Sequence, residues 1–152
     1  MALRVSLALM FLVGLLLPAV AFAGVDPVFT ATFSDVAIRG YDPVAYFAAG
    51  EPVKGSDDFA HQWMGAEWRF ASAENRDLFA ADPEKYAPQY GGYCAYAVSR
   101  GKTASIDPEA WRIVDDKLYL NYNAKIQAQW EEDQAANIEK ADEHWPRLLS
   151  DD

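Results

Sequence analysis

Alternating apolar and polar positions predict two β-hairpins in this chain. The first covers residues 57–64 and 67–71, whose aromatic side chains stand on either side of a Met-Gly turn. The second covers residues 111–114 and 117–121, on either side of an Asp-Asp turn. A period of two, with β-branched and aromatic residues, is typical of strands that bury one face. On this alternation, His61 lies on the aromatic face of its strand.

Capping residues and helical spacing predict the other elements. Asp42 followed by Pro43, and Ser72 followed by acidic residues, are each typical of a helix N-terminus. Asn123 is expected to cap the C-terminal helical region, and Pro146 to bend or end it. Apolar residues recur in that region at helical spacing: Ile126, Trp130, Ile138, Ala141, Trp145 and Leu148. The pattern predicts an α+β fold, in which a small antiparallel β-sheet of two hairpins packs with helices and a long C-terminal helix follows.

The N-terminal residues 1–23 have the order of a Sec-type secretory signal. Arg4 precedes an apolar run from Val5 to Leu17, and small residues then prepare cleavage after Ala23. The alternative is a retained membrane anchor, but the apolar run is shorter than the roughly 18 residues that a spanning helix needs. We therefore expect an exported protein, periplasmic or secreted, with one domain at residues 24–152 and no membrane attachment after cleavage.

Charge and motifs narrow the function classes. The formal net charge is −10 at pH 7, which argues against nucleic acid and anionic membrane surfaces as partners, because both attract basic patches. The sequence contains no nucleophile elbow, phosphate-binding loop, dinucleotide fingerprint, HExxH or CxxC motif. Its acidic clusters lack the alternating oxygen spacing of a calcium loop. Nothing in the sequence therefore names a reaction.

Several stretches of the chain resemble YHS-domain proteins of the exported bacterial type. They are GYDPVAYF from Gly40, GAEWRFASAENRDLFAADPEKY from Gly65, YGGYCAYAVSRG from Tyr90 and DDKLYLNYN from Asp115. The core of the resemblance is at about residues 41–86, and residues 24–152 form a YHS-like domain with a C-terminal helical extension. The resemblance implies metal association, with copper as the candidate.

The resemblance also implies where the metal ligands of such domains stand. Metal-associated YHS domains carry cysteines at three positions that correspond to Ala45, Ala71 and Asn75 of this chain. None of the three is a cysteine here. A metal site would therefore have to be built from other side chains.

Few soft-metal ligands remain outside the signal. They are Cys94, the single cysteine of the chain, with His61, His144 and Met64. The sharpest metal hypothesis is a copper or zinc site at Cys94 and His61, completed by Met64 or a tyrosine. His144 is expected to be a solvated surface histidine.

Cys94 has two further interpretations. At the first turn of a helix that follows Gly91-Gly92, its thiol pKa would fall and a reactive thiolate would form. Alternatively, Cys94 is a small buried core residue among Ala95, Ala97 and Val98. The three interpretations, namely metal ligand, reactive thiol and core residue, stay open from the sequence.

Tyr41 and Tyr93 each adjoin a glycine-bearing turn and are candidates to line one small-molecule pocket. With the metal hypothesis, they favour an exported binding or accessory protein that captures a metal ion or small ligand without catalytic activity. The alternative is a protein-interaction module that docks on a protein partner, holds no ligand and uses Cys94 only structurally. An enzyme is the third and least supported class.

Overall fold

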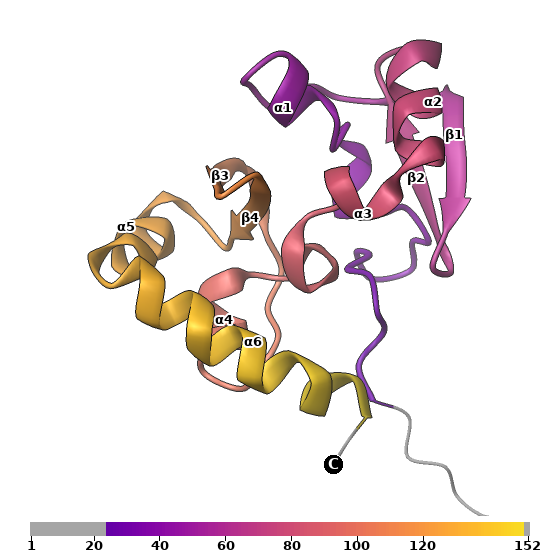
Figure 1. The fold of residues 1–152 in the computed structure, drawn as a ribbon. Helices are drawn as coiled ribbons and strands as arrows, with labels where there is room; N and C mark the ends of the chain where they lie inside the picture. Colours follow the sequence, from indigo (N-terminus) through magenta and orange to yellow (C-terminus); the bar gives the residue numbers. More distant parts are fainter. Residues whose placement is uncertain (1–23, 151–152) are drawn as a thin grey trace, which may run out of the picture.

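A computed structural model describes residues 24–150 of the chain, so the predicted signal at residues 1–23 lies outside the described residues. Within residues 24–150, no helix has both the length and the apolar character that crossing a bilayer requires. The α+β class is confirmed, with two antiparallel hairpins and a long C-terminal helix (Figure 1).

Both predicted hairpins are present, and each forms its own two-stranded sheet. Strand β1 (Ser56–Trp63) pairs with β2 (Ala66–Phe70), and β3 (Asp107–Val114) pairs with β4 (Lys117–Asn121). Both two-residue turns have positive φ at their two central residues, which is the type I′ geometry that matches strand twist. In each hairpin the pairing register shifts near the start of the first strand, that is, at the end away from the turn. Such an irregularity is typical of a β-bulge, which bends the strand.

Short helices connect these hairpins, and longer ones end the chain. The helices are α1 (Ala45–Ala48), α2 (Ala73–Ala81), α3 (Pro83–Tyr86), α4 (Ala95–Ser99), α5 (Ala124–Glu132) and α6 (Gln134–Ser150), with 3-10 turns η1 (Ile38–Gly40) and η2 (Gln89–Gly92). The predicted caps are confirmed: Ser72 Oγ accepts from the Asn75 amide at 3.1 Å, and Asn123 Oδ1 accepts from the Ile126 amide at 2.8 Å. Asp42 caps α1, which begins at Ala45, two residues later than its Asp-Pro pair suggests.

The C-terminal region contains a break that the sequence did not predict, and of the two effects expected of Pro146, a bend or an end of the helix, the end is absent. A break at Asp133, whose backbone is not helical, divides it into α5 and α6. The Asn137 side chain donates to the Trp130 carbonyl at 2.9 Å and so joins the end of α5 to α6 across the break. Pro146 does not end the helix, because α6 continues through it to Ser150. A proline costs the helix one hydrogen bond, and α6, which packs against α4, accommodates it without ending.

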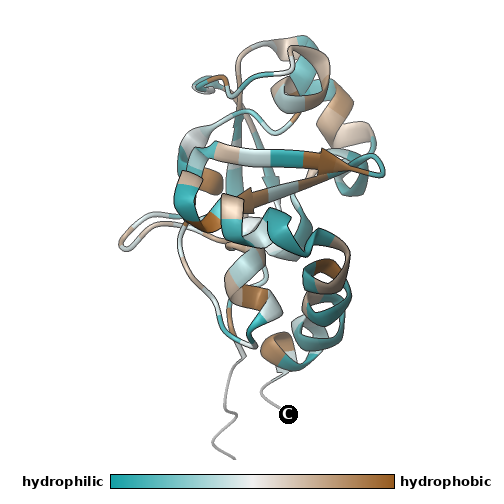
Figure 2. Cartoon of the chain, turned by 90° about the vertical axis from the view of Figure 1, so that its left-hand side faces the viewer, coloured by the Kyte–Doolittle hydropathy of each residue, from teal (hydrophilic) through white to brown (hydrophobic). Residues whose placement is uncertain are grey.

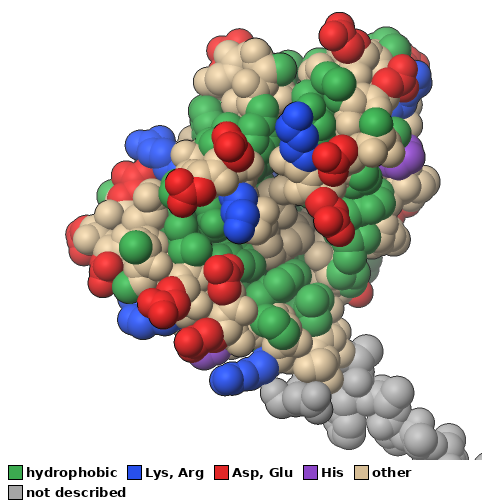
Figure 3. All heavy atoms as spheres, viewed as in Figure 1, with side chains coloured by type: hydrophobic (Ala, Val, Ile, Leu, Met, Phe, Trp, Pro, Cys, Tyr) green, Lys and Arg blue, Asp and Glu red, His purple; other side chains and the backbone are tan. Residues whose placement is uncertain are grey.

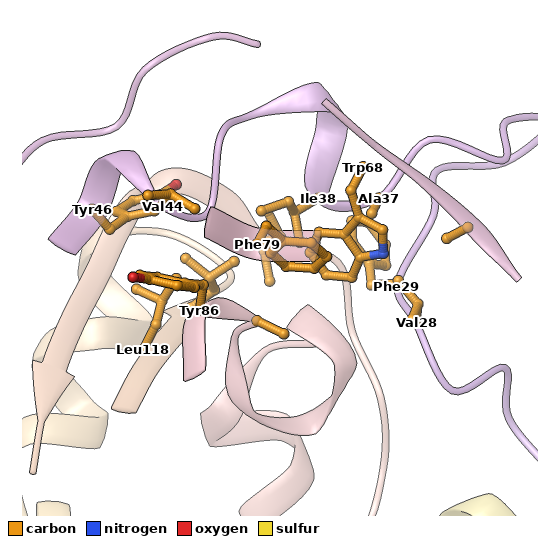
Figure 4. Close-up of a cluster of buried hydrophobic side chains, with 14 of the residues drawn as sticks. Val28, Phe29, Ala37, Ile38, Val44, Tyr46, Trp68, Phe79, Tyr86 and Leu118 are labelled. Carbon is orange, nitrogen blue, oxygen red and sulfur yellow. The ribbon is translucent and has the colours of Figure 1, made fainter. Parts of the chain in front are cut away.

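Two hydrophobic clusters fill the interior. The larger is built around Phe79, whose ring lies 5.1 Å from those of Trp68 and Phe70, centroid to centroid (Figure 4). The smaller is built around Trp130, whose ring lies 5.4 Å from that of Tyr119. Residues of α4 and α6, which pack against each other, also belong to this smaller cluster. The first hairpin and α2 therefore belong to the larger cluster and α6 to the smaller one, whereas α5 contacts both, through Ile126 and Trp130 respectively.

The two ends of the described chain lie on the same side of the molecule (Figure 2). The backbone amide of Val25 donates to the Leu148 carbonyl at 3.0 Å, near the end of α6. Phe29 then donates to the Gly91 carbonyl at 2.9 Å and leads the N-terminal segment past η2. This segment, η2 and α6 form one wall of the groove described below.

Candidate functional site

Cys94 lies immediately before α4 and is 1% exposed. Its Sγ is 3.6 Å from Oδ1 of Asn121, which also accepts from the Tyr96 amide at 3.1 Å. Burial raises the pKa of the Cys94 thiol, and backbone N–H groups nearby offset this only in part. These surroundings favour the core-residue interpretation over the reactive thiolate, since a protonated buried thiol is a poor nucleophile.

His61 lies elsewhere. It is half-buried on β1, opposite Trp68, and its ring packs edge-on to Phe79 with centroids 6.1 Å apart. Strand β1 and helix α4 are well separated in Figure 1. Among residues 24–150, no three side chains of His, Cys, Asp or Glu are placed to hold one metal ion. The metal site at Cys94 and His61 therefore stays a prediction. The described residues place no third His, Cys, Asp or Glu side chain where it could complete such a site.

The two tyrosines predicted to share a pocket have different neighbours. Tyr41 stacks under the Lys54 ammonium, 5.0 Å from the ring centroid. Tyr93 packs between Phe29 and Trp145, with ring centroids 5.5 and 6.0 Å away. Neither tyrosine is among the residues that line the groove described below.

Ala45, Ala71 and Asn75, at the positions where the resemblance implies cysteines, all donate hydrogen bonds to the carboxylate of Asp42. Asp42 is fully buried, and its Oδ1 accepts from the backbone amides of Val44 at 2.8 Å and Ala45 at 3.2 Å. Its Oδ2 accepts from the Ala71 amide at 2.9 Å and from Nδ2 of Asn75 at 2.8 Å. Ala45, Ala71 and Asn75 are therefore neighbours in space although up to 30 positions apart in sequence. In this chain they surround a hydrogen-bonded carboxylate instead of a thiolate cluster.

A groove of about 510 Å³ opens between the two hydrophobic clusters. Its lining comes from five separate segments of the chain: Pro27, Val28, Trp63, Met64, Glu84, Ala87, Pro88, Gln89, Tyr90, Gly91, Lys117, Asp142, Trp145, Pro146 and Leu149. Hydrophobic side chains gather on the surface between the end of α6 and the tip of the first hairpin (Figure 3). The sequence pattern missed this groove because strand and helix periodicity predicts which residues share a face of one element, and here each segment contributes only a few residues.

Tryptophan side chains from the two clusters wall the groove. Trp63 packs edge-on to Phe79, with centroids 5.7 Å apart, and is further supported by Trp68 at 5.8 Å. Trp145 packs against Tyr90 and Tyr93, at 6.1 and 6.0 Å. Each indole is half-buried and held by aromatic neighbours, so both walls are formed before any ligand arrives.

A small polar edge completes the lining. The Tyr90 hydroxyl donates to Oδ1 of Asp142 at 2.8 Å, and burial together with this carboxylate raises the pKa of the Tyr90 phenol well above its usual range. Glu84 and Lys117 are the other charged residues of the lining, and both are exposed. An apolar cleft with a few polar groups has the composition of a small-molecule site.

Comparison with known proteins identifies one segment of the chain. The family model of the YHS domain matches residues 44–90, close to the core expected at 41–86. No curated protein and no solved structure matches the chain. The matched segment includes α1, the first hairpin, α2 and α3, and it supplies Trp63 and Tyr90 to the groove. The chain is therefore a YHS domain-containing protein, with the domain at residues 44–90.

Proposed function

We propose that this protein is an exported binding or accessory protein that captures a small, largely apolar ligand in the groove and does not transform it. The observation that carries the proposal is a preformed groove whose lining includes Trp63 and Trp145, each held by aromatic neighbours. Export follows from the signal predicted at residues 1–23 and is part of the proposal.

The size and the lining of the groove support small-molecule capture. Its volume of about 510 Å³ is within the range of about 300–1,000 Å³ that is usual for ligand sites. Each square ångström of apolar surface that a ligand buries there contributes about 25 cal/mol. Since aromatic packing already fixes both indoles, little ordering energy is lost on binding. The lining contains no histidine or cysteine, so it offers no familiar nucleophile–base pair for turnover.

A protein-interaction module is the second candidate. Met64 and Leu149 line the same groove and are 50% and 37% exposed. Exposed apolar side chains of this kind are typical of a surface that binds another protein. Cys94 would then be structural, in keeping with its burial. The third hypothesis, copper or zinc capture by Cys94 and His61, has less support because a ligand thiolate needs a lowered pKa, whereas burial raises the pKa of the Cys94 thiol.

The five tryptophans of the chain give the proposal a built-in test. Trp63 and Trp145 line the groove, while Trp68, Trp111 and Trp130 do not. Protein purified from cells expressing the full chain, labelled with ¹⁵N, is titrated with 2-naphthol as a neutral apolar probe. The indole N–H signals, assigned by single Trp→Phe variants, are followed by NMR. We expect saturable shifts for Trp63 and Trp145 and smaller shifts for the other three.

Two results would contradict the proposal. One is the absence of any saturable shift up to the solubility limit of the probe. The other is a set of shifts centred on Trp111, which lies on β3 and outside the groove. Trp111→Phe is the matched control variant, because it removes a half-buried indole without touching the lining.

A further inference from the structure

The charged residues of the groove favour one sign of ligand charge. The lining holds two carboxylates, Glu84 and Asp142, against one ammonium, Lys117. Among the ion pairs of residues 24–150, none involves any of these three residues. The only hydrogen bond to the Asp142 carboxylate in that part of the chain comes from the Tyr90 hydroxyl, so one carboxylate oxygen stays open to a ligand. The chain as a whole, at −10, adds a field of the same sign.

The apolar walls point to the same kind of ligand. The faces of indole rings attract cations through the negative charge of the π system, and Trp is the strongest of the aromatic residues in this respect. Trp63 and Trp145 are both half-buried, so part of each ring remains exposed to the groove. A ligand with an apolar body and an ammonium group would thus meet indoles and carboxylates together.

We propose that the groove selects small organic cations, namely amines with an aromatic or alkyl body. This inference rests on the proposed function and names the ligand class for the same site. The apolar body packs between the two indoles, and the ammonium group lies towards Asp142 and Glu84. Lys117 weakens the selection without reversing it, because two carboxylates oppose one ammonium.

Three probes with the same aromatic body test the charge preference. They are phenethylammonium, 2-phenylethanol and 3-phenylpropionate, which present a cation, a neutral hydroxyl and an anion at the end of a two-carbon chain. Dissociation constants come from the indole N–H shifts of Trp63 and Trp145 at low ionic strength. We expect the cation to bind about 5-fold more tightly than the alcohol, and the anion to bind most weakly. Added salt should reduce the difference, because the rim charges are exposed.

Variants assign the preference to particular carboxylates. Asp142→Asn and Glu84→Gln each remove one charge, and in the first the amide oxygen can still accept from Tyr90. The double variant should bind the cation and the alcohol about equally. Glu143→Gln is the matched control, since it removes a carboxylate from the residue next to Asp142 without changing the lining. It should keep the full cation preference.

The outcomes separate this inference from the function on which it rests. If the alcohol binds and the cation binds no more tightly, the organic-cation inference is overturned and ligand capture stands. Cation preference that survives in the double variant would also overturn it. If none of the three probes shifts Trp63 and Trp145, and 2-naphthol shifts neither, ligand capture and its charge preference both fall.

Discussion

Two buried polar centres stand at the starts of short helices, and they differ in how completely they are hydrogen-bonded. The Asp42 centre, before α1, gives its carboxylate four donors between 2.8 and 3.2 Å. The Cys94–Asn121 centre, before α4, satisfies Oδ1 of Asn121 but leaves its buried Nδ2 without a partner among the described residues. The first is a closed network, and the second is only partly satisfied.

The difference shows what each centre contributes. Asp42 joins the start of α1 to the turn between β2 and α2, so that one carboxylate fixes two segments of the YHS domain. Cys94 makes one weak contact to Asn121 and otherwise packs as a small apolar group. Neither centre opens to the groove, since none of these residues is part of its lining. Neither centre therefore takes part in the ligand site that we propose in the groove.

The strongest test of the comparison is Asp42→Ala. It leaves the amides of Val44, Ala45 and Ala71 and the Asn75 side chain without their acceptor inside the protein. We expect the free energy of unfolding to fall by about 3–5 kcal/mol, measured by urea denaturation followed by circular dichroism.

Two further variants test the same hydrogen-bond network even if Asp42→Ala does not fold. Asn75→Ala removes one of the four donors and should cost about 1 kcal/mol. Glu139→Ala, at an exposed carboxylate of α6, should change stability by less than about 0.5 kcal/mol. A small loss for both Asp42→Ala and Asn75→Ala, similar to that of Glu139→Ala, would show that the network does not hold the domain together.

The Cys94 centre should give a smaller effect that depends on pH. Because burial raises the pKa of the Cys94 thiol above its ordinary value of 9.0, the folded state keeps the proton that the unfolded chain loses. The stability tied to this thiol is therefore fully present below pH 9 and is lost as the pH rises towards the folded-state pKa. The slope should approach, at most, about 1.4 kcal/mol per pH unit.

Urea denaturation between pH 7 and 10 checks this slope, with Cys94→Ala as the comparison. This range stops at the ordinary tyrosine pKa of 10.0, above which buried tyrosines such as Tyr119, with a pKa of about 12, begin to contribute. The wild type should lose stability with pH more steeply than Cys94→Ala. Parallel curves, or a native thiol that iodoacetamide alkylates as fast as it does in urea, would show that Cys94 is exposed and ionisable.

The sequence predicted the elements better than it predicted the site. Both hairpins and the caps at Ser72 and Asn123 follow from local patterns, because strand alternation and side-chain capping act over only a few residues. The break at Asp133 was missed since apolar spacing continues across it. Asp42 was predicted as a cap, but its bonds to Ala71 and Asn75 depend on tertiary contact and leave no local pattern.

Candidate chemistry was harder to locate for the same reason. Residue type drew attention to Cys94 and His61, although reactivity depends on burial and neighbours, which become known only once the chain is folded. The groove joins Trp63 to Trp145 across more than half of the described chain. Tryptophans at such positions are most simply predicted as core residues, and only the folded structure shows that both line one groove.

One measurement compares the groove and the Cys94 centre directly: the dissociation constant of 2-naphthol for Trp145→Leu and for Cys94→Ala. Trp145→Leu removes an aromatic wall while keeping apolar bulk, and should weaken binding about 5-fold. Cys94→Ala should leave the dissociation constant within about 2-fold of the wild-type value, because Cys94 is not part of the lining. The reverse result, with binding lost in Cys94→Ala and kept in Trp145→Leu, would contradict a ligand site in the groove.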